Sequence, residues 1–280
     1  MEQIWTIRGD RPLGVGQDFG LLGIVNLSPD SFAQTESGLG PLDLLKRALT
    51  LRAQGADILD LGGESTRPGA TPLDSEVEGF RLWPLLCRLR KEARGTILSL
   101  DTYHAKTAKL ALEMGVDIIN DISHACFEPE LLEVLASTKP GYVLMHSKGR
   151  PKTMQKAPHY DDCVTEVLAF FEEQLNRLVK SGLPENRIVL DPGIGFGKNL
   201  AHNLALLKNI KRFTSLGRPL LVGLSYKQLF FDLLGLPLAQ RGSITQVATA
   251  LLWQQGVFWH RVHDVAKARE ALTLAAQLKS

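Results

Sequence analysis

The sequence contains few cysteines, and they are far apart along the chain. Cys87, Cys126 and Cys163 are the only three among 280 residues, and no two of them form a CxxC motif. An odd number of widely separated cysteines argues against a disulfide framework and against a structural zinc site. Free thiols are typical of a reducing compartment, so we expect the protein in the cytoplasm.

Long apolar runs and an excess of one charge are also missing. No stretch approaches the roughly 18 consecutive apolar residues that cross a membrane. The first ten residues include Glu2, Arg8 and Asp10 and no apolar core, so we expect no signal peptide. The formal net charge is +2, with acidic and basic residues interspersed. This balance gives no footprint for nucleic acid or for a membrane surface, and it favours small-molecule partners.

The sequence does contain an alternation of short apolar runs and helix-period segments. The apolar runs are nearly continuous, as in strands buried on both faces of a parallel sheet. Amphipathic segments lie between them, for example residues 42–54, 75–91, 104–114, 163–180 and 200–213. Since a (β/α)8 (TIM) barrel takes roughly 250 residues, we predict this α/β fold. Its eight parallel strands are expected at residues 22–26, 57–61, 97–100, 118–120, 142–145, 188–190, 220–224 and 258–262.

Residues 3–17 precede the first of these strands and resemble two short strands around Gly9-Asp10. We expect a β-hairpin within residues 1–20 that covers the bottom of the barrel. No linker or low-complexity segment divides the chain, so residues 1–280 are predicted to form a single domain. The competing architecture is a doubly wound open sheet, but the segment LGIVNLSPD lacks the glycine fingerprint that follows its first strand.

Polar residues follow or end each apolar run. The carboxyl ends of barrel strands meet on one face, where barrel enzymes bind their substrates. We therefore expect these distant residues to converge in space. They are Asn26, Asp60 with Glu64, Asp101, Asn120, His146, Asp191, Ser225 with Lys227, and Arg261 with His263.

The residue types in this set suit a base and an anion. Asp101, Asn120 and Asp191 offer acceptors and one mixed donor and acceptor, which could recognise the amino-pyrimidinone edge of a bicyclic base. For Asp101, capping of the following helix is the alternative. Arg261 and His263 are two residues apart, so both side chains project from the same side of a strand and could clamp a phosphate or diphosphate.

Three further features carry weaker signals. The amide oxygen of Asn26 could bind Mg²⁺, which prefers oxygen ligands. The loop GGESTRPGA at residues 62–70 suits a lid that closes over an anion, with an ordinary surface loop as the alternative. The glycines of DPGIGFGK at residues 191–198 let a planar ligand approach the backbone, although no Walker spacing follows. A histidine after an apolar strand, such as His146, is frequently a satisfied core residue.

Taken together, these segments resemble the motifs of the dihydropteroate synthase family of folate biosynthesis. The resemblance spans residues 22–265 and implies a barrel transferase. Such an enzyme joins 6-hydroxymethyl-7,8-dihydropterin diphosphate to p-aminobenzoate and releases 7,8-dihydropteroate and pyrophosphate. A homodimer and a target of sulfonamides are also implied. The motifs, in chain order, are LGIVNLSPDSF, GADILDLGGESTRPGA, LDTY, DIINDI, VLMHSKGRPKTMQ, DPGIGFGK, LVGLSYK and RVHDV.

The resemblance also assigns roles to residues of this sequence. It implies that the pterin is bound by Asp101, Asn120, Asp191 and Lys227. It implies that the diphosphate is bound by Asn26, Thr66, Arg261 and His263, with Asn26 contacting Mg²⁺. The aminobenzoate would lie near Phe32, Pro68, Ser225 and Gln228. The implied catalytic residues are Asp101, Asp191, Lys227 and Arg67.

The sequence departs from the family pattern mainly on the side of the second substrate. Tyr226 and Gln228 flank Lys227, where the family usually has arginine and a small hydroxyl residue. Gln34 replaces a usual aspartate, and Ser147 stands where methionine is frequent. The changes at Tyr226, Gln228 and Gln34 keep open a non-catalytic pterin-binding paralogue. A pterin-binding methyltransferase is a second alternative, because it would share the acids that recognise the base, but it has no use for the motifs STRPG and RVH. The apolar run at residues 247–253, with Trp259 nearby, could supply a dimer interface or could pack on the barrel.

Overall fold

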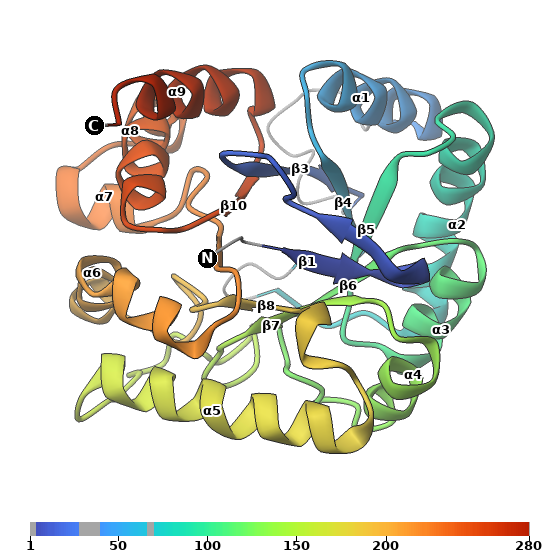
Figure 1. Cartoon of the computed structure of the whole chain (residues 1–280), viewed down its shortest axis with the longest axis horizontal. Helices are drawn as coiled ribbons and strands as arrows, with labels where there is room; N and C mark the ends of the chain where they lie inside the picture. Colours follow the sequence, from blue (N-terminus) through green and yellow to red (C-terminus); the bar gives the residue numbers. More distant parts are fainter. Residues whose placement is uncertain (1–3, 28–39, 66–69, 280) are drawn as a thin grey trace.

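The computed structural model describes residues 4–27, 40–65 and 70–279. A ring of strands lies inside a ring of helices (Figure 1). Within the described residues, eight parallel strands form one sheet in the order β8-β7-β6-β5-β4-β3-β10-β9. The two edges of this sheet meet, because Leu190 pairs with Leu220 and the Leu190 N–H donates to the Pro219 carbonyl at 3.0 Å. The predicted (β/α)8 barrel is therefore confirmed.

The strands agree closely with their predicted ranges except for β9. That strand was expected at residues 220–224, but it is short because the chain turns at once, and the Lys227 N–H donates to the Leu224 carbonyl at 3.1 Å. The barrel strands are β3 (Gly20–Asn26), β4 (Ile58–Gly62), β5 (Ile97–Asp101), β6 (Ile118–Asp121), β7 (Gly141–Met145), β8 (Ile188–Asp191), β9 (Leu221–Val222) and β10 (Trp259–Val262).

The helices pack their apolar faces on the outside of the sheet. The prediction of a single helix over 200–213 is wrong, since α6 ends at Lys208 and a 3-10 helix, η4 (Ile210–Leu216), follows. Between them the Asn209 side chain donates to the Ala205 carbonyl at 2.9 Å, a local bond that competes with helix continuation. The helices are α1 (Pro41–Ala53), α2 (Ser75–Glu92), α3 (Ala105–Glu113), α4 (Leu131–Thr138), α5 (Cys163–Ser181), α6 (Leu200–Lys208), α7 (Leu229–Leu234), α8 (Arg241–Gln254) and α9 (Val265–Gln277).

The predicted N-terminal hairpin is present and covers one end of the barrel. Its strands β1 (Trp5–Ile7) and β2 (Arg11–Leu13) pair in antiparallel fashion, and β1 crosses the ring of strands in Figure 1. The Trp5 indole N–H donates to the Arg187 carbonyl at 2.7 Å. Trp5 and Ile7 belong to one buried cluster with the inward-facing residues of the lower barrel, namely Leu22, Ile58, Ile118, Val143, Val189, Leu221 and Trp259.

Trp259 cannot contribute to an outer interface, so that part of the interface hypothesis is wrong. Its side chain is fully buried and meets the Trp5 ring edge to face, with centroids 5.5 Å apart. Alternation along β10 points position 259 into the barrel. In helix α8, Leu252 and Trp253 pack inward, as the packing interpretation of the apolar run predicts. Val247 and Leu251 are exposed, and the interface interpretation stays a prediction.

Removal of the N-cap of α6 is expected to destabilise the fold by about 1 kcal/mol. The Asn199 side-chain oxygen accepts from the His202 N–H at 2.9 Å and satisfies one donor at the helix start. Urea unfolding of Asn199→Ala would measure the loss. Asn176→Ala is the matched control, because Asn176 lies inside α5, where alanine is the better helix former. A loss of stability in the control that equals the loss in Asn199→Ala would contradict the capping role.

No helix in the described part of the chain has the length and apolar character needed to cross a membrane.

Candidate active site

The strand registers bring the predicted residues together at the carboxyl end of the barrel. Asn26 is aligned with Gly62, Gly62 with Asp101, and Asp101 with Asn120. These residues therefore lie side by side across β3, β4, β5 and β6. Asp191 ends β8, and Arg261 projects from β10 toward the same interior.

An ion triad occupies the centre of this site. The Arg261 Nε donates to Asp60 Oδ2 at 2.6 Å, and its Nη2 donates to Asp101 Oδ2 at 2.7 Å. Asn120 Nδ2 also donates to Asp60 Oδ2, at 3.2 Å. One guanidinium thus neutralises only one of two buried carboxylates. The helix-capping alternative for Asp101 is wrong, because His104 is the N-cap of α3 and Asp101 binds Arg261 instead.

The triad is short of hydrogen-bond donors. Within the described residues, Asp60 Oδ1, Asp101 Oδ1 and Ser99 Oγ are buried without a hydrogen-bond partner. Burial raises the pKa of Asp101 above its usual range and outweighs the attraction of Arg261, and the negative charge of Asp60 adds to the rise. The site is therefore prepared to accept a ligand that brings hydrogen-bond donors or positive charge.

Asp191 and Lys227 form the opposite wall. Asp191 Oδ1 accepts from the Gly193 N–H at 2.8 Å. Lys227 donates to the Ile194 carbonyl, and its Nζ lies 4.9 Å from the centroid of the Phe196 ring. Burial raises the pKa of Asp191, whereas burial lowers the pKa of Lys227 to about 8, with Asp191 opposing that fall. A carboxylate and an ammonium group thus face the site from adjacent strand ends.

The glycine-rich segment after β8 passes very close to the loop after β7. Gly193 has φ +66°, and a Cβ at this position would lie 1.9 Å from the His146 carbonyl oxygen. Lys198 is almost fully buried and links the two segments through hydrogen bonds. It donates to His146 Nδ1 at 2.8 Å and to the Gly193 carbonyl at 3.0 Å. Burial lowers the pKa of His146 well below its ordinary value. His146 is therefore a satisfied core histidine, as predicted.

The residues after β9 and β10 contact one another. The Ser225 hydroxyl accepts from the His263 N–H at 3.2 Å, and the Tyr226 ring meets the His263 ring edge to face. Gln228 is exposed, but both polar ends of its side chain have partners. Its amide nitrogen donates to Asp232 at 3.1 Å, and its amide oxygen accepts from Arg241 at 3.3 Å.

Several predicted residues lie outside the described part of the chain. They are Phe32, Gln34, Thr66, Arg67 and Pro68. Their roles toward the diphosphate and the aminobenzoate, and that of Arg67 in catalysis, stay predictions. Ser147 is described, and its hydroxyl donates to the Ile122 carbonyl at 2.7 Å.

Sequence analysis gave no role to three groups that shape the site. Asp60 was noted as a strand-end residue, but it lies in the middle of β4 and faces inward. Lys198 ends the DPGIGFGK motif, and its charge beside three glycines was the available signal. Glu64 accepts from Tyr103 Oη at 2.9 Å and from the Leu73 N–H at 3.1 Å, so it joins the two ends of the loop after β4. No sequence spacing indicated that last contact.

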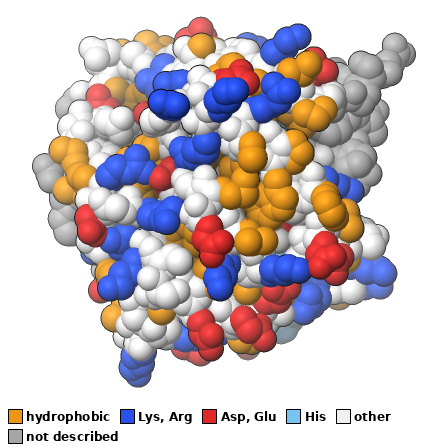
Figure 2. Space-filling view, turned by 90° about the vertical axis from the view of Figure 1, so that its right-hand side faces the viewer, with side chains coloured by type: hydrophobic (Ala, Val, Ile, Leu, Met, Phe, Trp, Pro, Cys, Tyr) orange, Lys and Arg blue, Asp and Glu red, His pale blue; other side chains and the backbone are white. Residues whose placement is uncertain are grey.

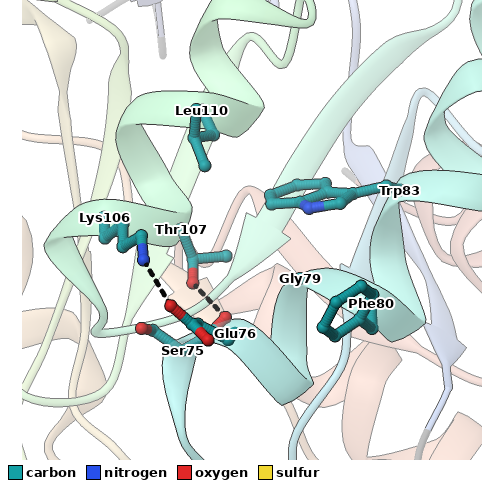
Figure 3. A pocket seen from close by; sticks show the side chains of 8 residues that line it. All are labelled: Ser75, Glu76, Gly79, Phe80, Trp83, Lys106, Thr107 and Leu110. Atoms are coloured by element: carbon teal, nitrogen blue, oxygen red, sulfur yellow. Dashed lines mark hydrogen bonds and ion pairs between the residues drawn. The ribbon is translucent and has the colours of Figure 1, made fainter.

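A groove of about 320 Å³ lies between α2 and α3 (Figure 3). Its rim includes the Glu76–Lys106 ion pair at 2.9 Å. Phe80 is 77% exposed beside it, and hydrophobic side chains gather on this side of the molecule (Figure 2). The residues that line this groove include none of the predicted site residues, so we place the active site at the strand ends.

Comparisons with known proteins agree with this geometry. The family model described as "Pterin binding enzyme" matches residues 22–263. The chain is 39% identical over 252 residues to the dihydropteroate synthase of Escherichia coli strain K12, covering 90% of this chain and 89% of that relative. It is 41% identical over 233 residues to the dihydropteroate synthase of Synechocystis, covering 81% and 80%.

Solved structures give the same result. Dihydropteroate synthase from Yersinia pestis, in a sulfonamide drug complex, superposes with a TM-score of 0.91 at 36% identity and covers 98% of both chains. Dihydropteroate synthase from Xanthomonas albilineans, with 4-aminobenzoic acid, superposes with a TM-score of 0.90 at 36% identity and covers 100% of both chains.

Proposed function

The chain belongs to the dihydropteroate synthase family of pterin-binding enzymes, and we propose that the residues at its strand ends carry out this family's reaction in the roles given below. The protein is a transferase that condenses 6-hydroxymethyl-7,8-dihydropterin diphosphate with p-aminobenzoate. The observation that best supports the proposed roles is the ion triad of Asp60, Arg261 and Asp101, flanked by Asn120, Asp191 and Lys227. A methyltransferase is not favoured, because it has no use for the motifs STRPG and RVH. The similar proteins reported above are also dihydropteroate synthases.

The pterin is proposed to bind Asp101, Asn120, Asp191 and Lys227. Carboxylate oxygens accept from the ring N–H and amino groups, while the Lys227 ammonium donates to a ring carbonyl or nitrogen. These groups are fixed by their bonds to Arg261, Asp60, Gly193 and Ile194 before any ligand arrives. Fixed charges that await the ligand need little reorganisation during reaction.

The diphosphate is proposed to bind Arg261 and His263, with Asn26 nearby and Thr66 from the loop after β4. The bond from the pterin methylene carbon to oxygen breaks, and pyrophosphate leaves with the electron pair. Positive charge then spreads into the dihydropterin ring, where the Asp101 and Asp191 carboxylates stabilise it.

The amine nitrogen of p-aminobenzoate forms the new bond to the methylene carbon and then loses a proton to water. This amine is neutral before reaction and needs positioning more than deprotonation. Phe32, Pro68, Ser225 and Gln228 are proposed to position it, with Arg67 also acting in catalysis. The reaction requires no protein nucleophile.

We propose Mg²⁺ as the cofactor, with Asn26 as its protein ligand. Within the described residues, no three His, Cys, Asp or Glu side chains gather around a metal position. A single amide oxygen fits Mg²⁺, which binds substrate phosphates and retains several waters. When bound, the ion would neutralise charge that develops on the leaving pyrophosphate.

Treatment with EDTA is expected to abolish turnover, and added Mg²⁺ is expected to restore it.

A product assay tests the proposed function. Purified protein with the pterin diphosphate, p-aminobenzoate and Mg²⁺ should release pyrophosphate and form dihydropteroate in equal amounts. Binding of the pterin substrate without product above a heat-inactivated control would instead support the non-catalytic paralogue.

The pH dependence of kcat/KM is expected to show an alkaline limb at about pH 8, where Lys227 loses its proton. Burial lowers the pKa of this ammonium group, so its donor charge is present below that pH and lost above it. In Lys227→Arg the side chain stays protonated, and the limb should move upward by more than about one unit. Lys211→Arg, at an exposed lysine, is the control and should keep the wild-type profile. If the alkaline limb of Lys227→Arg stays at about pH 8, the titrating group is not Lys227.

Gln228→Ser is expected to strengthen sulfonamide inhibition and to lower the KM for p-aminobenzoate by roughly 3- to 10-fold, the value of one hydrogen bond. Both polar ends of Gln228 already form hydrogen bonds, with Asp232 and with Arg241. Gln228 is therefore a weaker hydrogen-bond partner for the aminobenzoate or a sulfonamide than a serine hydroxyl would be. Inhibition constants for the variant and for Gln277→Ser, an exposed control on α9, would measure the effect. Equal constants for wild type and Gln228→Ser would remove the basis for this prediction.

We further propose a homodimer, with contacts through the exposed apolar residues of α7 and α8. Phe231, Leu234, Val247 and Leu251 are each about half exposed. Analytical ultracentrifugation should give about twice the 30.8 kDa chain mass. A single species at the chain mass would contradict this proposal.

The free thiols of Cys87, Cys126 and Cys163 support the proposed cytoplasmic location.

A further inference from the structure

Asp60 is a buried acidic residue at the centre of the barrel, and no contact with either substrate is proposed for it. It lies in the middle of β4, aligned with Ile24 on one side and Ser99 on the other, and its side chain is fully buried. A single oxygen, Oδ2, accepts from both Arg261 Nε at 2.6 Å and Asn120 Nδ2 at 3.2 Å. A buried carboxylate is costly, so its retention beneath a binding site calls for an explanation.

We propose that Asp60 is a positioning residue of the pterin site that fixes the orientation of the Asn120 amide. This inference rests on the proposed role of Asn120 in pterin binding. Arg261 supplies a positive charge beside the Asp60 side chain in the barrel interior.

The chemistry of the contact determines which way the amide faces. An ionised carboxylate can only accept hydrogen bonds, so the Asn120 NH₂ group must point toward Asp60. The Asn120 carbonyl oxygen and the second amide hydrogen then remain for other partners. A neutral amide at position 60 could donate as well as accept, and both orientations of Asn120 would become possible.

The neighbouring groups leave Asp60 as the anion within reach of this amide. Asn120 is aligned with Asp101 in the sheet, but its amide nitrogen donates to Asp60 Oδ2 at 3.2 Å and not to Asp101, which accepts from Arg261 Nη2 at 2.7 Å. Asp121 follows Asn120 in β6, yet its oxygens accept from the Ser123 and Ala125 N–H groups at 2.6 Å on the outer side of the strand. Asp60 and Asn120 therefore form a pair between strands that are separated by β5.

A double-mutant cycle with 6-hydroxymethylpterin tests the inference, because this probe lacks the diphosphate. Asp60→Asn and Asn120→Ala are each expected to weaken its binding by roughly 10- to 100-fold, the range for a charged hydrogen bond. If Asp60 acts through Asn120, the double variant should bind no more weakly than Asn120→Ala alone. Asp121→Asn, which changes a buried carboxylate on the outer side of β6, is the control and should bind the probe as wild type does.

Additive losses in the cycle would overturn the inference, since Asp60 would then act independently of Asn120. Equal binding by wild type and Asp60→Asn would also overturn it. A wild-type protein that binds no pterin would instead contradict the proposed function. Circular dichroism checks the fold of each variant, and Asp60→Ser, whose small side chain leaves room for water, replaces Asp60→Asn in the cycle if that variant does not fold.

Discussion

Asp191→Asn is expected to lower kcat/KM for dihydropteroate formation by about 10²- to 10³-fold. The carboxylate ends β8 and accepts from the Gly193 N–H at 2.8 Å, so it is held at the pterin site before the substrate binds. An amide of the same shape keeps that hydrogen bond but loses the negative charge. Stabilisation of the cationic pterin is therefore removed with little change in geometry.

The same substitution is not expected to weaken the fold. Burial raises the pKa of Asp191, which means that the folded protein bears a desolvation penalty for its charge. The neutral amide removes that penalty, so the thermal midpoint should stay the same or rise. Loss of activity with unchanged stability would identify a residue that is retained for function.

Asp121→Asn provides the matched control for Asp191→Asn. Asp121 is also a fully buried carboxylate at a strand end, but it accepts from Ser123, Ala125 and Tyr142, which lie outside the proposed pterin set. Both Asp121 oxygens accept hydrogen bonds, and asparagine has only one acceptor oxygen, so Asp121→Asn should lower the melting temperature. It should leave kcat/KM within a few-fold of wild type. If Asp191→Asn reduces kcat/KM no more than Asp121→Asn does, Asp191 has no role in charge stabilisation.

The sequence predicted the barrel well because its physical signal is local. Continuous apolar runs such as Tyr142 to Met145 and Ile188 to Leu190 can be satisfied only by burial on both faces, which indicates parallel strands. The errors occur where a side chain overrides the pattern. Asn209 ends α6 early by bonding to the backbone, and the turn before Lys227 shortens β9.

The sequence predicted the site less completely, because it identifies residues at strand ends but not their partners. Asp101, Asn120, Asp191 and Arg261 do converge, as the barrel geometry requires. The partners of Asp60 lie 60 and 201 positions away, and only the strand order brings them together. Lys198 likewise contacts His146 across 52 positions. Such contacts depend on the register of several strands, which periodicity does not encode.

Arg261→Met is expected to destabilise the folded state by about 3–5 kcal/mol near pH 8 and to abolish measurable turnover. The guanidinium donates to Asp60 at 2.6 Å and to Asp101 at 2.7 Å, and its removal leaves both buried carboxylates without a counter-ion. Methionine fills a similar volume, so the main loss is electrostatic. Urea unfolding at pH 8 would measure it.

The destabilisation of Arg261→Met should become smaller as the pH falls from 8 to 6. Burial already raises the pKa of Asp101 in the folded wild type, and loss of Arg261 raises it further. The folded variant then binds a proton more tightly than the unfolded chain, so its stability increases as the pH decreases. Arg241→Met is the control, because buried Arg241 donates to the neutral acceptors Leu236, Tyr226 and Gln228. Its loss of stability should not depend on pH in this range.

A second substitution distinguishes the electrostatic contribution to the destabilisation of Arg261→Met from the packing contribution. Adding Asp101→Asn removes one of the two uncompensated carboxylates, so the double variant should regain a large part of the lost stability at pH 8. It should also lose most of the pH dependence, because Asp101 is the carboxyl group of the triad whose pKa burial raises. If Arg261→Met is equally destabilised at pH 6 and pH 8, the loss comes from packing. The triad would then contribute to pterin recognition without being the electrostatic centre of the barrel.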